Sequence, residues 1–233
     1  MINQTLPQGC LSQPTRECQY EATGNSTFFI PDVEFSTLLI DHMMIASAVG
    51  ISRASLDMPG VLIGADGRAV NPCDDYAQLG RDCPAGVRVG VPGAPDILPV
   101  QTLLRAAGIG SLDQRAGELG VLQDETLRFS GVVVVLSIEY SNYLSRTGSW
   151  AEGTVAYRYA ASAVPNSEFK GEEVLPGPGA GGAERAIVDR HGVRFVVKQS
   201  GAVGTFDTAV STSPSPRGST SVGRGQGKRI DRR

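Results

Sequence analysis

The sequence has no long apolar run, which limits how it can relate to a membrane. Its most apolar stretch, Val132 to Leu136, is far shorter than the roughly 18 apolar residues that a helix needs to cross a bilayer. The residues from Met1 to Thr5 contain neither a basic start nor the apolar core of a signal peptide. We therefore expect a soluble domain with no membrane span of its own.

Charge of one sign and histidine are also scarce. The formal net charge of −3 is too small to indicate nucleic acid or a membrane surface as a partner of the whole chain. Only two histidines occur, His42 and His191, too few for a zinc site without carboxylates. No G-x-S-x-G turn is present for a nucleophile, and the paired Asp74 and Asp75 are expected to be solvated. The sequence therefore predicts no enzyme and no cofactor.

Two glycine-rich segments are similar to nucleotide-binding loops. Residues 177–182 match G-x-G-x-x-G, but prolines lie within and before them, and no adequate helix follows. Residues 223–229 are similar to a P-loop, but Val222 replaces its first glycine and Arg229 its Ser or Thr. Neither segment is interpreted as a cofactor site.

The four cysteines form two close pairs, with separations of eight and ten residues that do not match the spacing of zinc ligands. Of the three possible connectivities, sequential pairing, Cys10–Cys18 and Cys73–Cys83, is the natural one. Disulfides are typical of oxidising compartments, and sequons at Asn3 and Asn25 are candidates for N-glycosylation. These features favour an extracellular or luminal location.

Abundant glycine and proline, 29 and 14 residues, favour short strands joined by turns. One short amphipathic helix is predicted over residues 98–107, ending at Gly108. The fold class is therefore mainly β, an antiparallel, sandwich-like domain with one short helix. Valines 132–135 predict a strand buried on both faces. The strands are expected at residues 28–30, 35–40, 127–140, 153–161 and 193–197.

The sequence divides into three parts. Residues 1–20 form an entry segment with the first cysteine pair, and residues 21–207 form the β-rich region, in which residues 175–183 are expected to be a flexible loop. Residues 208–233 contain six Lys or Arg and one Asp among Ser, Gly and Thr. Because this last part cannot form a core, we expect a disordered basic tail.

Three groups of motifs occur in a fixed order. The first is the sequon at Asn25 with the strands up to Ile40. The second is the pair Cys73 and Cys83, followed by Pro84 and an amphipathic segment. The third is Tyr157-Arg158-Tyr159-Ala160 with two later motifs, His191-Gly192-Val193-Arg194-Phe195 and residues 201–207. In order and spacing, these groups resemble the extracellular domain of ionotropic purinergic receptors, the trimeric ATP-gated cation channels.

The resemblance implies a ligand and an assembly. In this family, ATP lies between neighbouring subunits and basic side chains hold its phosphates; the fork of donors in arginine suits phosphate oxygens. Arg158 matches the family's phosphate-binding arginine, and Arg190 lies beside Asp189, where the family has a lysine. The parent protein is then a homotrimer, joined to the membrane only through helices that this chain lacks.

Departures from the family pattern leave a second interpretation open. Ala156 replaces an asparagine, Asp189 replaces the lysine, and Ser141 replaces a cysteine. Both transmembrane helices of the family are missing, so the resemblance implies a truncated ectodomain. The alternative is a secreted β-sandwich binding or adhesion module without channel activity.

Overall fold

The computed structural model describes residues 1–7, 10, 12, 18–142, 154–177 and 182–204. Two compact units are formed from alternating segments of the chain. Unit 1 contains residues 1–33, 111–134 and 163–195, and unit 2 contains residues 34–110, 135–162 and 196–233. The predicted basic tail lies outside the described residues.

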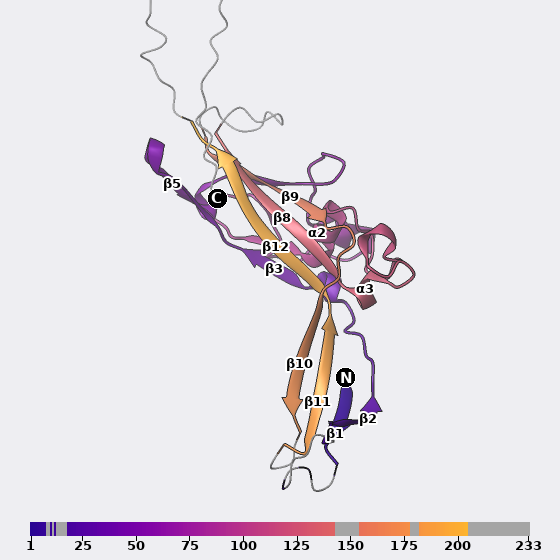
Figure 1. The fold of residues 1–233 in the computed structure, drawn as a ribbon. Coiled ribbons are helices and arrows are strands. Elements are labelled where there is room, and N and C mark those ends of the chain that lie inside the picture. Colours follow the sequence, from indigo (N-terminus) through magenta and orange to yellow (C-terminus); the bar gives the residue numbers. More distant parts are fainter. Residues whose placement is uncertain (8–9, 11, 13–17, 143–153, 178–181, 205–233) are drawn as a thin grey trace, which may run out of the picture. The chain divides into compact units, whose positions relative to one another are not determined.

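Unit 1 contains a four-stranded sheet in the order β10-β11-β1-β2, which Figure 1 shows as four neighbouring ribbons. All three pairings are antiparallel. The predicted entry segment supplies β1, and the hairpin of β10 and β11 was not predicted. The strands are β1 (Ile2–Thr5), β2 (Glu21–Asn25), β10 (Lys170–Pro176) and β11 (Glu184–His191).

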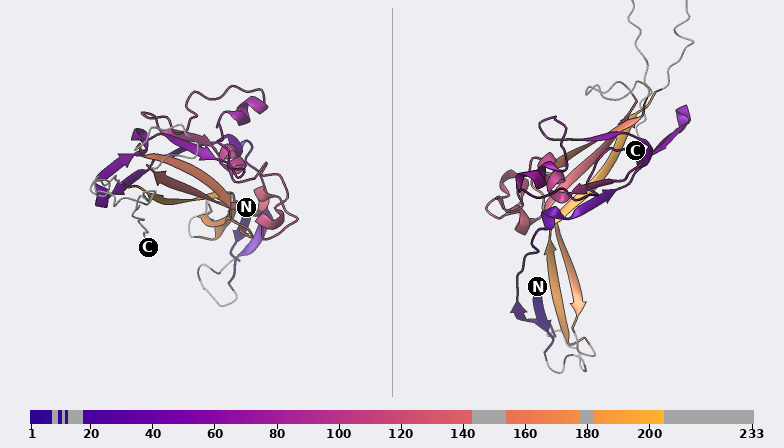
Figure 2. Two further views of the ribbon diagram at one scale, coloured as in Figure 1. Left: turned by 90° about the horizontal axis from the view of Figure 1, so that it is seen from above. Right: turned by 180° about the vertical axis from the view of Figure 1, so that it is seen from behind.

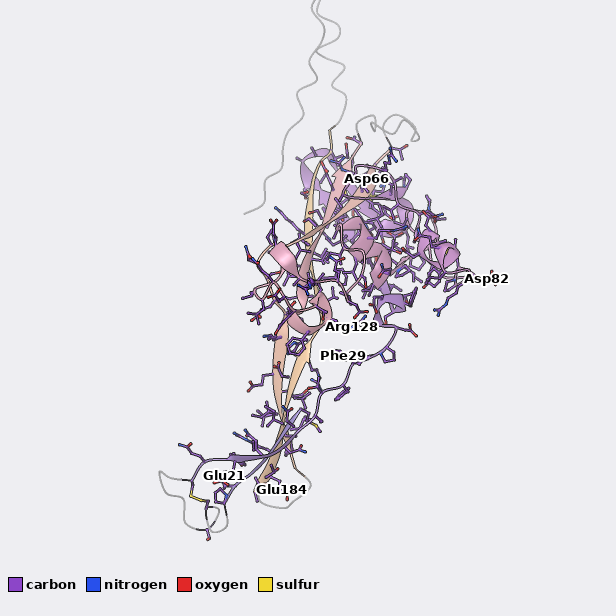
Figure 3. All side chains as sticks on the ribbon, turned by 90° about the vertical axis from the view of Figure 1, so that its right-hand side faces the viewer. Glu21, Phe29, Asp66, Asp82, Arg128 and Glu184 are labelled. Carbon is purple, nitrogen blue, oxygen red and sulfur yellow. A yellow bond between two sulfur atoms is a disulfide. The ribbon has the colours of Figure 1, made fainter. Side chains whose placement is uncertain are left out.

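Helix α3 (Leu127–Ser130) occupies the start of the strand predicted over residues 127–140. The Thr126 side chain caps it by accepting the backbone N–H of Phe129 across 3.3 Å. Gly131 ends it with φ +74, a conformation that favours glycine. Arg128, labelled in Figure 3, forms two hydrogen bonds to Asp113, at 2.6 and 3.0 Å. The strand prediction was therefore wrong for this first turn.

The second sheet has the order β12-β8-β9-β6 and lies mostly in unit 2; Figure 2 shows its long strands from two further directions. The β6–β9 pair is parallel, with Leu62 opposite Tyr159, which departs from the purely antiparallel prediction. A parallel pair needs a long crossover connection, and the long connection between β6 and β9 allows one. The strands are β6 (Gly60–Ile63), β8 (Val132–Ser141), β9 (Ala156–Ala163) and β12 (Val193–Ala202).

Strand β8 alternates strictly between buried and half-buried side chains. Val132 and Val134 are fully buried, whereas Val133 and Val135 on the other face are only partly covered. The prediction of burial on both faces was therefore wrong. The run of valines reflects β propensity together with one fully buried face.

The remaining strands of unit 2 form two antiparallel pairs, β3 with β7 and β4 with β5. Residues 28–30 of unit 1, which were predicted as a strand, form no strand and expose Phe28, Phe29 and Ile30. The strands are β3 (Thr37–Ile40), β4 (Met43–Ala46), β5 (Ile51–Ala54) and β7 (Asp96–Pro99). Single 3-10 turns occur at Val33–Phe35, Ser47–Val49, Ser55–Asp57 and Gly117–Leu119.

The described part of unit 2 also contains two short helices. Helix α2 (Val100–Ala106) lies within the predicted range, and α1 (Asp74–Gln78) was not predicted. Asp75 is buried, accepts the Thr102 hydroxyl at 2.8 Å and lies 3.3 Å from the Arg105 guanidinium. It therefore joins α1 to α2 and is not solvated as expected.

Both predicted disulfides, Cys10–Cys18 and Cys73–Cys83, are present. Most strand pairs are antiparallel and the helices are few and short, so the mainly β fold class is confirmed. No helix within the described part of the chain is long and apolar enough to span a membrane.

Candidate functional site

Strand β9 presents Arg158 to solvent. Successive side chains of a strand point to opposite faces; Tyr157 and Tyr159 are buried, and Arg158 between them is exposed. Arg158 donates from Nε to Glu139 Oε2, on the neighbouring strand β8, across 2.7 Å. The two side chains are 54% and 45% exposed. Since exposed ion pairs contribute about 0–1 kcal/mol, Arg158 can exchange Glu139 for another anion at little cost.

The inner face of β9 meets a buried carboxylate, Asp96 on β7. Its Oδ2 atom accepts the hydroxyls of Tyr157 and Tyr159 across 2.6 and 2.7 Å, and Oδ1 accepts the Gly90 N–H across 2.7 Å. Asp96 is only 1% exposed. Such burial is tolerable because three donors satisfy the carboxylate.

His42, between β3 and β4, extends this network. Its Nε2 and Nδ1 atoms each lie 2.8 Å from a tyrosine hydroxyl, those of Tyr159 and Tyr140. The Tyr159 proton is donated to Asp96, so Tyr159 accepts from Nε2–H. In the neutral imidazole, Nδ1 then accepts the Tyr140 hydroxyl. This pattern of donors assigns the Nε2–H tautomer to His42. Both ring nitrogens, the hydroxyls of Tyr140 and Tyr159, and the Asp96 carboxylate are then all hydrogen-bonded.

Burial determines the protonation of these groups. It lowers the pKa of His42 below 6.5, against the opposing effect of the Asp96 and Asp41 carboxylates. Burial raises the pKa of Tyr140 to about 12. Burial, with hydrogen bonding to Asp96, also raises the pKa of Tyr157 and Tyr159. At neutral pH, the imidazole and all three phenols are therefore uncharged.

Gly60 makes room for the Tyr157 ring, and Gly90 makes room for the Gly60 backbone. A Cβ on Gly60 would lie 2.2 Å from Tyr157 Cε2, and one on Gly90 would lie 1.9 Å from the Gly60 carbonyl oxygen. Gly90 also has φ +68. The backbone of β6 therefore lies directly against the ring, which requires glycine at both positions.

Arg190, the second predicted ligand, lies on β11 of unit 1, whereas Arg158 lies in unit 2. It forms an ion pair with Glu173 on β10 and is 62% exposed. Each candidate arginine thus has a carboxylate of its own on a neighbouring strand. Neither carboxylate was predicted from the sequence.

The buried network of His42, Asp96 and the tyrosines was not predicted from the sequence either. Asp96 precedes a predicted helix and carries no motif, and His42 was considered only as a metal ligand or catalytic residue. The alternation of two tyrosines about Arg158 was the available signal, because buried tyrosine hydroxyls need partners. Within the described residues, no group of three or more His, Cys, Asp or Glu is placed to hold a metal ion.

The sequons lie on neighbouring strands of unit 1. Asn3 is on β1 and Asn25 ends β2, and both are exposed. In the strand register Asn3 faces Gly24, and Ile2 faces Asn25. This exposure is compatible with glycosylation, which stays a prediction.

Comparison with known proteins gives a consistent set of relatives. P2X receptor E of Dictyostelium discoideum is 36% identical over 206 residues, covering 88% of this chain and 47% of the relative. P2X receptor A of the same organism is 30% identical over 195 residues, covering 84% and 46%. The chain spans about half the length of the curated relatives it matches. No protein-family model matches it.

A solved structure was also found. It is the crystal structure of an invertebrate P2X receptor from the Gulf Coast tick, in the presence of ATP and Zn²⁺. Its TM-score is 0.41 at 17% identity, over 74% of this chain and 41% of that chain.

The two disulfides, the mainly antiparallel β fold and the relatives agree on one class of protein. The chain is a P2X ectodomain-like protein, which confirms the resemblance found in its sequence.

Proposed function

We propose that this chain is the ligand-binding, extracellular part of an ATP-gated cation channel. The observation that supports this most directly is the exposed Arg158 between two anchored tyrosines, in a chain whose relatives are named P2X receptors. Arg158 is the proposed phosphate ligand, because its guanidinium offers several donors to phosphate oxygens. Arg190 is the second proposed contact.

ATP binding by the purified chain tests this function. NMR titration suits the test because a chain with part of a site binds weakly. ATP should shift the Arg158 side-chain signal and the β9 amides, and Arg158→Ala should remove the β9 shifts. Arg53→Ala, an exposed arginine of the same unit, should leave them intact. Equal β9 shifts in wild type and Arg158→Ala would refute the role of Arg158.

A trimer of the parent protein is part of the proposal. The exposed faces of β3 and β4 carry the apolar side chains of Leu39, Met43 and Ile45, each more than half exposed. Exposed apolar side chains are candidates for contact surfaces, and we assign these three to subunit contact. Light scattering should show concentration-dependent self-association that Met43→Glu weakens.

The proposed location is the extracellular or luminal face of a membrane. Two disulfides support an oxidising compartment. The parent protein would reach the membrane through segments beyond the matched region. Membrane fractionation of cells that express the complete gene tests this location.

A secreted binding module without channel activity is the second candidate. Glu139 and Glu173 already neutralise the two candidate arginines, which favours a surface that binds no phosphate. Absence of any ATP-induced shift at Arg158 and Arg190 would support the module over the channel.

A further inference from the structure

The exposed Arg158–Glu139 pair on the outer side of the sheet has a buried counterpart on its inner side. Arg158 precedes Tyr159 on β9, and Glu139 precedes Tyr140 on the adjacent strand β8. Outside, the arginine and the glutamate form an ion pair. Inside, His42 bridges the two tyrosine hydroxyls through its two ring nitrogens. The same two strands are thus connected on both faces at consecutive positions.

Asp96 connects both neighbours of Arg158 to one atom. Its Oδ2 accepts the hydroxyls of Tyr157 and Tyr159, the residues directly before and after the arginine. Side chains two residues apart point to the same face of a strand. A single acceptor for both therefore opposes rotation of β9 about its own axis, the motion that would turn Arg158 away from solvent.

The Asp96 carboxylate, which accepts both tyrosine hydroxyls, is itself held in place. Asp96 begins β7, where it pairs with Ile40 of β3, and its second oxygen accepts the Gly90 N–H. At 1% exposure, no bulk water competes for its oxygens. The Tyr157 ring lies against Gly60 and has no room to move in that direction.

We propose that Asp96 is a positioning residue for Arg158: through Tyr157 and Tyr159 it fixes the orientation of β9, so that the guanidinium stays presented for an anionic phosphate ligand. His42 extends this hold to β8 and so keeps Glu139 opposite the arginine. The choice of ligand rests on the proposed function, whereas the hold on Arg158 does not.

The ligand-free Arg158 side chain provides the first test. In the wild type, its Nε–H signal in a nitrogen-15 NMR spectrum should exchange slowly with solvent, because Glu139 accepts it. Arg158→Lys identifies the signal. In Asp96→Asn or Tyr157→Phe, this exchange should become about 2- to 10-fold faster, the factor to which one net hydrogen bond corresponds.

A stability-matched control separates positioning from general loosening. Leu103→Ala removes a fully buried side chain of α2 and leaves the network residues unchanged. It should lower the stability of the protein without changing the Arg158 Nε–H exchange. An equal acceleration in Leu103→Ala, or no acceleration in both network variants, would overturn the proposal. If Asp96→Asn fails to fold, Tyr157→Phe, which removes one hydroxyl, decides.

Titration with ATP tests the ligand separately. The two network variants are Asp96→Asn and Tyr157→Phe. If the Arg158 Nε–H exchanges faster in them, they should also bind ATP about tenfold more weakly, which corresponds to about 1.4 kcal/mol. If Arg158→Ala leaves ATP binding unchanged while the network variants still accelerate the exchange, the proposed function fails and the positioning role stands. If Arg158→Ala weakens binding but the network variants change neither exchange nor affinity, the positioning role fails and the function stands.

Discussion

The Nδ1 atom of His42 accepts the hydroxyl of Tyr140 across 2.8 Å, in a site where burial lowers the pKa of the imidazole below 6.5. This contact needs an unprotonated Nδ1. Besides Tyr140, the titratable groups around the ring are Tyr157, Tyr159, Asp96 and Asp41. The phenols stay neutral at ordinary pH, so the state of the ring decides whether the chain of hydrogen bonds persists.

Acid should therefore destabilise the protein through His42. As pH falls, the unfolded chain takes up the histidine proton first, because the folded pKa is lower. The contribution to stability is complete above about pH 6.5 and is lost as the pH falls through the folded value. Urea unfolding between about pH 5 and 8 should show this decline, and His42→Gln should reduce its slope. His191→Gln is the control and should keep the His42 contribution. Equal slopes in His42→Gln and the wild type would contradict the prediction.

Gly60→Ala should destabilise unit 2 strongly. The added Cβ would lie 2.2 Å from the Tyr157 ring, so either β6 or the ring must move. A loss above about 3 kcal/mol is expected for overpacking combined with damage to a buried network. At Gly86 a Cβ would meet Ile97 at 3.6 Å, an ordinary contact. Chemical denaturation of both variants should give a loss at Gly60 and little change at Gly86; similar values would argue against the close approach.

Loss of the Cys73–Cys83 disulfide should lower stability by about 2–3 kcal/mol, the loop-closure value for a ten-residue separation. The double variant Cys73→Ser/Cys83→Ser is compared with the wild type by urea denaturation. Mass spectrometry of non-reduced peptides should find the linked pair in wild-type protein. Free thiols at both positions in folded protein would rule out this bond.

Thr126→Ala should cost about 1 kcal/mol, because it removes the side-chain cap of α3. Thr126→Ser keeps the accepting hydroxyl and should recover most of that loss. Thermal unfolding of the three proteins checks this order. If the serine and alanine variants are equally stable, the hydroxyl does not act as a cap.

Expression through a secretory pathway should produce glycans at Asn3 and Asn25, since both sequons are exposed. Glycosidase treatment should then reduce the mass, and Thr5→Ala and Thr27→Ala should each remove one site. An unchanged mass after treatment would mean that neither site is used.

The sequence predicted what depends on local pattern. The spacing of the cysteines predicted both disulfides, and the apolar residues with Gly108 predicted helix α2. The order and spacing of three groups of motifs together predicted the resemblance to the purinergic receptor ectodomain. The parts it missed depend on distant contacts. Residues 127–130 form helix α3 and not the start of a strand, because Thr126 caps the helix and Gly131 ends it. The apolar residues that follow Gly131 hid both signals in the sequence.

The buried network shows the same limit. Asp96 is separated from Tyr157 and Tyr159 by about sixty positions, so no local pattern joins them. Asp75 was expected in solvent, yet it is buried and pairs with Thr102 and Arg105 of α2. In each case the partner that makes burial favourable comes from another element of the fold.

The alternating segments of the two units have a consequence for dissection of the molecule. The chain passes from one unit to the other after residues 33, 110, 134, 162 and 195. No single cut can release either unit as a continuous polypeptide, and three of those passages fall within β8, β9 and β12 or at their ends. Deleting either half of the chain would remove segments of both units. Point substitutions are therefore the way to assign a property to one unit.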